Sequence, residues 1–226
     1  MRHPSIVFDL DDTLYPERSY ALSGFRAAAV WAERSLGIKD LDAEMTRLLD
    51  LGHLGKLFAM ALGKAYPAHS ADDLAGLLDA YRTHDPVIEL FPDAVAALDH
   101  YGRQGQLGLI TDGTHAMQAA KVRALGLAPR FASIVYTDAL GAERAYFKPH
   151  PRAFEVAAAA LGAAGRPLVY VGDNPAKDFI APNAMGWTTV QVVRPGGVHD
   201  SAKTVAGGAA HHVVGSLDEL PRALGF

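Results

Sequence analysis

Two aspartates, Asp9 and Asp11, stand two positions apart at the end of a short apolar run near the start of the chain. Side chains alternate along an extended segment, so the two carboxylates are expected to point the same way. Carboxylates placed like this repel each other unless a cation or a proton lies between them. Two more aspartates, Asp173 and Asp178, follow a later apolar run. Oxygen donors of this kind, in a chain without Cys and without a convincing His cluster, favour a hard cation, and Mg²⁺ fits best.

Groups of the opposite character stand at two other positions. Thr111 offers a hydroxyl at the end of another apolar run, beside the turn at Asp112 whose backbone N–H groups can face an anion. Lys148 precedes a proline, which biases it towards an extended conformation from which it can project its charge at a phosphoryl group. Each pattern alone is typical of an ordinary turn. Only their occurrence together with the aspartates makes them informative.

The elements that must position these residues are readable from the hydrophobic pattern. Short runs rich in β-branched residues alternate with helical stretches, as expected for a parallel sheet covered on both faces. The predicted strands are residues 5–9, 107–111, 133–137, 168–172, 188–193 and 212–215. This pattern predicts a doubly wound α/β core, in which ligands bind beyond the carboxyl ends of the strands. Asp9, Thr111 and Asp173 stand at such ends.

The stretch from about residue 17 to 88 shows no strand pattern. It predicts four helices, at roughly 18–36, 40–51, 54–65 and 71–83, separated by Gly and Pro. An all-helical block between the first two strands of a parallel sheet indicates an inserted subdomain. We therefore expect a Rossmann-like catalytic core of residues 1–15 and 90–226 and a helical cap of residues 16–89.

Taken in order, the segments at the strand ends resemble the four signature motifs of the haloacid dehalogenase superfamily of phosphohydrolases. They are DLDDT at 9–13, LITDG at 109–113, FKPHP at 147–151 and VGDNPAKD at 171–178. The resemblance spans most of the chain, and it implies that the helical block is the family's cap, placed over the active site.

The resemblance also implies a role for each motif residue. Asp9 would be the nucleophile that forms an aspartyl-phosphate. Asp11 would be the general acid for the leaving alcohol and then the general base for water, and its backbone carbonyl would meet the metal. Thr111 and Lys148 would hold the phosphoryl oxygens, next to the turn at Asp112.

The remaining metal ligands and two outlying contacts complete the predicted site. Asp173 would bind Mg²⁺ directly together with Asp9 and Asp11, and Asp178 would steady the metal shell. Arg18 and His115 are further candidates for contacts with the substrate.

The predicted function is that of a Mg²⁺-dependent phosphatase acting on a small phosphorylated metabolite through an aspartyl-phosphate. A dehalogenase is disfavoured, because dehalogenases lack an acid at the position of Asp11 and need no metal. Two alternatives stay open: a phosphosugar mutase, which the core motifs alone do not distinguish, and a non-catalytic module that binds phosphate or a partner. Sugar phosphates, nucleoside monophosphates and phosphoglycolate all remain candidate substrates.

The composition argues against nucleic acid and membranes as binding partners. The chain has 226 residues with 21 Lys and Arg against 25 Asp and Glu, so it lacks the basic surface that nucleic acid requires. No apolar stretch of signal-peptide or membrane-spanning length is evident. We expect a cytoplasmic monomer or homodimer that binds neither nucleic acid nor membrane.

Overall fold

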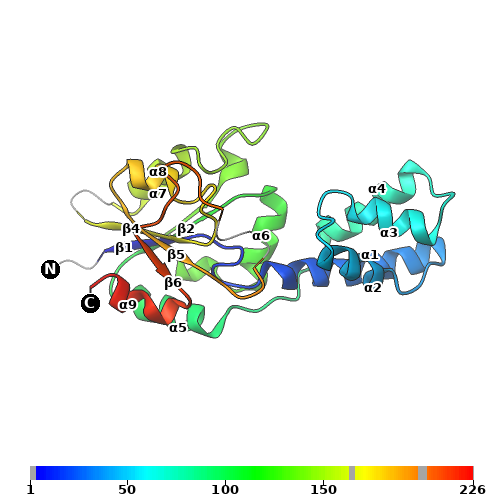
Figure 1. The fold of residues 1–226 in the computed structure, drawn as a ribbon, viewed down its shortest axis with the longest axis horizontal. Helices are drawn as coiled ribbons and strands as arrows, with labels where there is room; N and C mark the ends of the chain where they lie inside the picture. Colours follow the sequence, from blue (N-terminus) through cyan, green and yellow to red (C-terminus); the bar gives the residue numbers. More distant parts are fainter. Residues whose placement is uncertain (1–3, 163–165, 198–202, 226) are drawn as a thin grey trace. The chain divides into compact units, whose positions relative to one another are not determined.

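A computed structural model describes residues 4–162, 166–197 and 203–225. Six parallel strands form one sheet in the order β3-β2-β1-β4-β5-β6 (Figure 1). The strands are β1 (Ser5–Phe8), β2 (Leu107–Thr111), β3 (Ser133–Tyr136), β4 (Leu168–Gly172), β5 (Thr188–Val192) and β6 (His212–Val214). The chain runs outward from β1 to β3 and then returns to the other side of β1 through β4. The prediction of a doubly wound α/β sheet is confirmed, and the order reverses between β1 and β4.

The apolar sequence of β1 follows from its place in the middle of the sheet. Ile6 pairs with Leu107 of β2 on one side and with Val169 of β4 on the other. All four residues of β1 are fully buried. A strand covered on both faces has no solvent side, so its sequence is continuously apolar rather than alternating.

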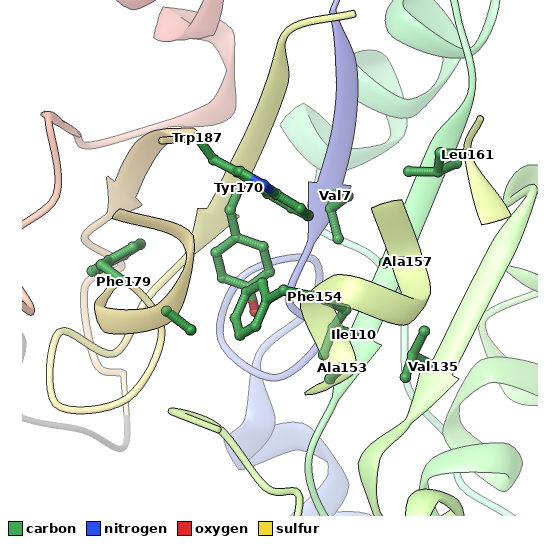
Figure 2. Packing of buried hydrophobic residues seen from close by; sticks show 11 residues of the cluster. Val7, Ile110, Val135, Ala153, Phe154, Ala157, Leu161, Tyr170, Phe179 and Trp187 are labelled. Carbon is green, nitrogen blue, oxygen red and sulfur yellow. The ribbon is translucent and has the colours of Figure 1, made fainter. Parts of the chain in front are cut away.

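The helices that follow the strands cover the sheet. The helices of this part of the chain are α5 (Pro92–Gly102), α6 (His115–Ala124), α7 (Arg152–Ala160), α8 (Ile180–Ala184) and α9 (Leu220–Ala223), with 3₁₀ turns η1 (Ala128–Arg130), η2 (Thr137–Leu140) and η3 (Leu217–Glu219). Figure 2 shows the apolar cluster under α7, where Phe154 meets Tyr170 and Trp187 edge-on at ring distances of 5.0 and 5.8 Å. This packing fixes Tyr170, which also reaches the site described below.

Contacts divide the chain into two compact units, one made of the residues before Arg18 and after Ile88, the other of Arg18–Ile88. All residues of the second unit are described, and none of them forms a strand. Its helices are α1 (Glu17–Leu36), α2 (Leu41–Asp50), α3 (Leu57–Ala65) and α4 (Ala71–Thr83). The predicted third helix begins three residues late, because the chain around Gly52 and Gly55 forms turns. None of the helices in the described residues has the length and apolar character needed to cross a membrane.

The helical unit has its own core. Phe25, Met45, Leu62 and Leu77 are among its buried apolar residues. The start of α4 is fixed by a capping box, in which the hydroxyl of Ser70 accepts from the Asp73 N–H and the Asp73 carboxylate accepts from the Ser70 N–H.

Candidate active site

The site residues stand where the central strands end. Asp9 follows β1 directly, and its N–H donates to the Val171 carbonyl of β4 at 2.8 Å. Asp173 follows β4 directly, and Thr111 is the last residue of β2. Because β1 lies between β2 and β4, the three residues meet at one edge of the sheet, at its topological switch point.

Three carboxylates come together there. Asp9, Asp173 and Asp178 each place an oxygen within 4.8 Å of the others, and all three are buried. The Asn174 N–H donates to Asp178 Oδ2 at 2.8 Å and so orients that carboxylate. A Cβ at Gly172 would lie 2.6 Å from the same oxygen, so glycine at this position lets the group close up.

Lys148 supplies a positive charge to this group. Its Nζ lies 2.6 Å from Asp9 Oδ1, 2.8 Å from Asp178 Oδ1 and 3.0 Å from the Tyr170 hydroxyl. Burial opposes protonation, but Asp178 and Asp9 hold the pKa of Lys148 well above its usual value. The lysine therefore stays charged and compensates one of the three negative charges.

The pKa values of Asp173 and Asp9 are both raised. Burial, together with the nearby charges of Asp178 and Asp9, raises the pKa of Asp173 to about 9. Burial likewise raises the pKa of Asp9 to about 6, although Lys148 opposes the shift. Asp9 and Asp173 therefore resist ionisation, whereas at Asp178 burial is outweighed by Lys148 and Lys177, which lower its pKa. A hard divalent cation would stabilise the charged forms of all three carboxylates. The donor set therefore fits Mg²⁺.

Asp11 does not bring its side chain into the group of three carboxylates. Strand β1 ends at Phe8, and Asp12 takes a left-handed backbone conformation with a φ of 51°, so the alternation of an extended segment does not apply. The Asp11 carboxylate accepts hydrogen bonds from Lys121 Nζ at 2.6 Å and from Gln118 Nε2 at 2.9 Å, and a third from the hydroxyl of Tyr15. Burial acts in the opposite direction, but these contacts, led by Lys121, lower the pKa of Asp11.

The side chain of Asp112, which lies in the turn predicted to face an anion, forms hydrogen bonds with other groups of the protein. Its Oδ1 accepts from the Thr137 hydroxyl at 2.8 Å and from the Lys148 N–H at 3.1 Å. Its Oδ2 lies 3.4 Å from Lys177 Nζ. The Asp112 side chain therefore holds the backbone of the loop that carries Lys148 (the lysine loop) in place. Its carboxylate oxygens accept hydrogen bonds from, or pair with, groups of the protein itself.

The two outlying candidates have other partners. Arg18 belongs to the helical unit, where its guanidinium forms an exposed 2.5 Å ion pair with Asp50. His115 begins α6, and its N–H donates to the Asp138 carboxylate at 2.9 Å. Its ring packs on Tyr136 at 4.7 Å. Among the described residues, the contacts of His115 are therefore with Asp138 and Tyr136 and not with the three carboxylates.

Several side chains of the site were not predicted from the sequence. Gln118 and Lys121 lie three residues apart, on one face of α6, and both are buried. The signal that could have revealed them is a Gln and a Lys at helical spacing just after a motif at a strand end. Lys177 stands inside the last motif.

Comparison with known proteins agrees with the arrangement. Residues 4–186 match the family described as haloacid dehalogenase-like hydrolase. A glyceraldehyde 3-phosphate phosphatase of Methanopyrus kandleri is 30% identical over 204 residues, with 84% of each chain covered. A phosphoserine phosphatase of Thermus thermophilus is 36% identical, with 84% of this chain and 88% of the relative covered.

Solved structures share the fold. The putative HAD-hydrolase YfnB of Bacillus subtilis, in a crystal form bound to magnesium, is 18% identical and covers all of both chains with a TM-score of 0.68. The match over residues 4–186, more than half of the chain, confirms the resemblance of the motifs. This chain belongs to the haloacid dehalogenase-like hydrolase family.

Proposed function

We propose that this hydrolase removes the phosphoryl group from a small phosphorylated metabolite, with Asp9 as the nucleophile and Mg²⁺ as the metal. The observation that carries the proposal is the buried group of Asp9, Asp173 and Asp178 with Lys148 between two of its members. The names of the two relatives, both phosphatases of small phosphate esters, support the substrate class.

Asp9, Asp173 and Asp178, with the backbone carbonyl of Asp11, would hold the metal. The magnesium-bound YfnB structure supports this choice of ion. When bound, Mg²⁺ would neutralise charge on the phosphoryl oxygens and keep the carboxylates ionised.

Asp9 would attack phosphorus with a carboxylate oxygen, and the bond from phosphorus to the leaving oxygen would break. Lys148, fixed on Asp9 Oδ1 at 2.6 Å, keeps that carboxylate oriented and adds a positive charge beside the transferred group. Thr111 would donate its hydroxyl hydrogen to a phosphoryl oxygen. Splitting the displacement in two lets a fixed nucleophile make the first attack and water the second.

Asp11 would carry the protons of both steps. In its protonated form Asp11 would give a proton to the departing oxygen, and the resulting carboxylate would take one from the water that attacks the aspartyl-phosphate, so the products are an alcohol and inorganic phosphate. Because burial is outweighed by the contacts that lower the pKa of Asp11, the protonated form is the minor one in the free protein. Proton transfer of this kind is worth roughly 10²–10⁴ in rate.

A phosphate-release screen over sugar phosphates, nucleoside monophosphates and phosphorylated three-carbon acids, with and without Mg²⁺, tests the proposal. We expect Mg²⁺-dependent release that Asp9→Asn abolishes. The matched control is Asp99→Asn, which changes an aspartate whose ion pair with Arg130 lies at the surface. Full activity in Asp9→Asn would refute the nucleophile, and conversion of the substrate without phosphate release would indicate transfer to a second hydroxyl instead of water.

A further inference from the structure

Helix α6 buries two long polar side chains at the catalytic end of the sheet. Gln118 is 2% exposed and Lys121 is 4% exposed. Burying an amide and an ammonium group costs free energy unless each finds partners. The helix begins four residues after Thr111, the end of β2, so both side chains are delivered to the residues beyond the strand ends.

Their partners include the two oxygens of Asp11. Lys121 Nζ donates to Oδ1 at 2.6 Å, and Gln118 Nε2 donates to Oδ2 at 2.9 Å. A carboxylate held at only one oxygen can rotate about its Cβ–Cγ bond. Contacts to both oxygens from one rigid helix fix the plane of the Asp11 carboxylate.

Gln118 also connects Asp11 to the threonine of the site. The same Nε2 donates its second hydrogen to Thr111 Oγ1. The nitrogen, and not the amide oxygen, must face this way, because the oxygen would be set against a carboxylate. Since Thr111 Oγ1 accepts this bond, its own hydrogen is directed to another acceptor.

The Gln118 side chain thus links Asp11, the proposed proton donor, to Thr111 beside the proposed phosphoryl site. Asp11 Oδ2 and Thr111 Oγ1 share one nitrogen, so they lie no more than two hydrogen-bond lengths apart. Gly113 lets the amide come this close to the turn, since a Cβ there would lie 3.1 Å from the Gln118 Cδ.

We propose that Gln118 and Lys121 are positioning residues, which hold the Asp11 carboxylate for its proton transfers, and that Gln118 also orients the Thr111 hydroxyl. The inference rests on the proposed function. A proton donor works only within hydrogen-bond reach of the leaving oxygen, and a displacement of about 1 Å can cost roughly 100-fold in rate.

Two esters of similar shape separate this role from a merely structural one. Phenyl phosphate releases a leaving group that needs a proton, whereas dinitrophenyl phosphate releases one that does not. The kcat/KM value covers the steps up to departure of the phenol, so later hydrolysis of the aspartyl-phosphate does not affect it. The readout is the ratio of kcat/KM for dinitrophenyl phosphate to that for phenyl phosphate.

The variants are Lys121→Met and Gln118→Leu, which keep the size of the side chain and remove its donors. We expect the ratio to rise about 10- to 100-fold in each. Gln118→Leu should in addition lower kcat/KM for both esters, because the Thr111 hydroxyl loses its partner. Lys121→Arg retains a donor and should restore most of the wild-type ratio. Gln104→Leu, which removes an exposed amide bonded to His100, is the matched control and should leave the ratio unchanged.

Urea unfolding confirms that each variant is folded before its kinetics are read. A ratio that stays at the wild-type value in both variants would overturn the positioning role, as would a gain in the rate with phenyl phosphate. Wild-type protein that releases phosphate from neither ester would overturn the proposed function, and the positioning role with it. Wild-type turnover with equal losses on both esters would overturn the positioning role alone.

Discussion

Replacing Asp173 with asparagine should stabilise the metal-free protein at neutral pH. Asp173 is 8% exposed, and burial beside Asp178 and Asp9 raises its pKa from 3.8 to about 9. A carboxyl whose pKa is higher in the folded than in the unfolded chain adds stability below the unfolded pKa, and this stability is lost as the pH rises towards the folded pKa. From about pH 4 to about pH 7 the loss is about 4 kcal/mol, at about 1.4 kcal/mol per pH unit. Asparagine does not titrate, so the variant does not lose this stability as the pH rises.

The assay is urea unfolding of wild type and Asp173→Asn in EDTA at the two pH values, repeated with saturating Mg²⁺. The free energy of unfolding of the variant, relative to wild type, should rise by about 4 kcal/mol from the acidic to the neutral pH. Mg²⁺ should stabilise the wild type by about 1.4 kcal/mol for each tenfold excess over its dissociation constant, and the variant much less. Parallel pH dependences of the two proteins, or an equal response to Mg²⁺, would refute the reasoning. Asp99→Asn should behave as wild type.

Three further changes have definite expected outcomes. Lys148→Met should abolish phosphate release and lower the free energy of unfolding by about 3–5 kcal/mol in urea, because two buried carboxylates lose their counter-ion; wild-type stability would contradict this. Arg194→Ala should lower stability through loss of its buried 2.6 Å pair with Asp93. Burial opposes ionisation of Asp93, but its hydrogen bonds, first that from Arg194, lower its pKa. The difference in stability between Arg194→Ala and wild type should therefore shrink when unfolding is measured at about pH 4 and below. Phe154→Ala should cost about 3–5 kcal/mol in thermal or urea unfolding, and a loss under 1 kcal/mol would show that the cluster in Figure 2 can collapse around it.

The central strands could be predicted closely because their sequences are continuously apolar, as expected for strands buried on both faces. Leu107–Thr111 and Leu168–Gly172 have the predicted bounds, and β1 ends one residue before the predicted end. The one-residue difference matters for the site. It places Asp9 and Asp11 on a turning loop, where the left-handed Asp12 redirects the chain. Hydrophobic pattern carries no information about such a turn.

The meeting of Asp9 with Asp173 could also be predicted, since both follow strands that the doubly wound topology brings together. The partners of Asp11 could not. They depend on the rotation of α6 about its axis, which turns Gln118 and Lys121 inward although most buried positions of a helix are apolar. The engagement of Asp112 with Thr137 and the lysine loop likewise depends on contacts between segments far apart in the sequence.

Trapping the covalent intermediate tests the central assignment most directly. Borohydride reduces an acyl phosphate and converts the modified aspartate to homoserine, which peptide mass spectrometry locates. With wild-type protein, Mg²⁺ and a substrate that turns over, we expect homoserine at position 9 and none without substrate. Homoserine at any other aspartate during turnover would contradict the assignment of Asp9 as the nucleophile.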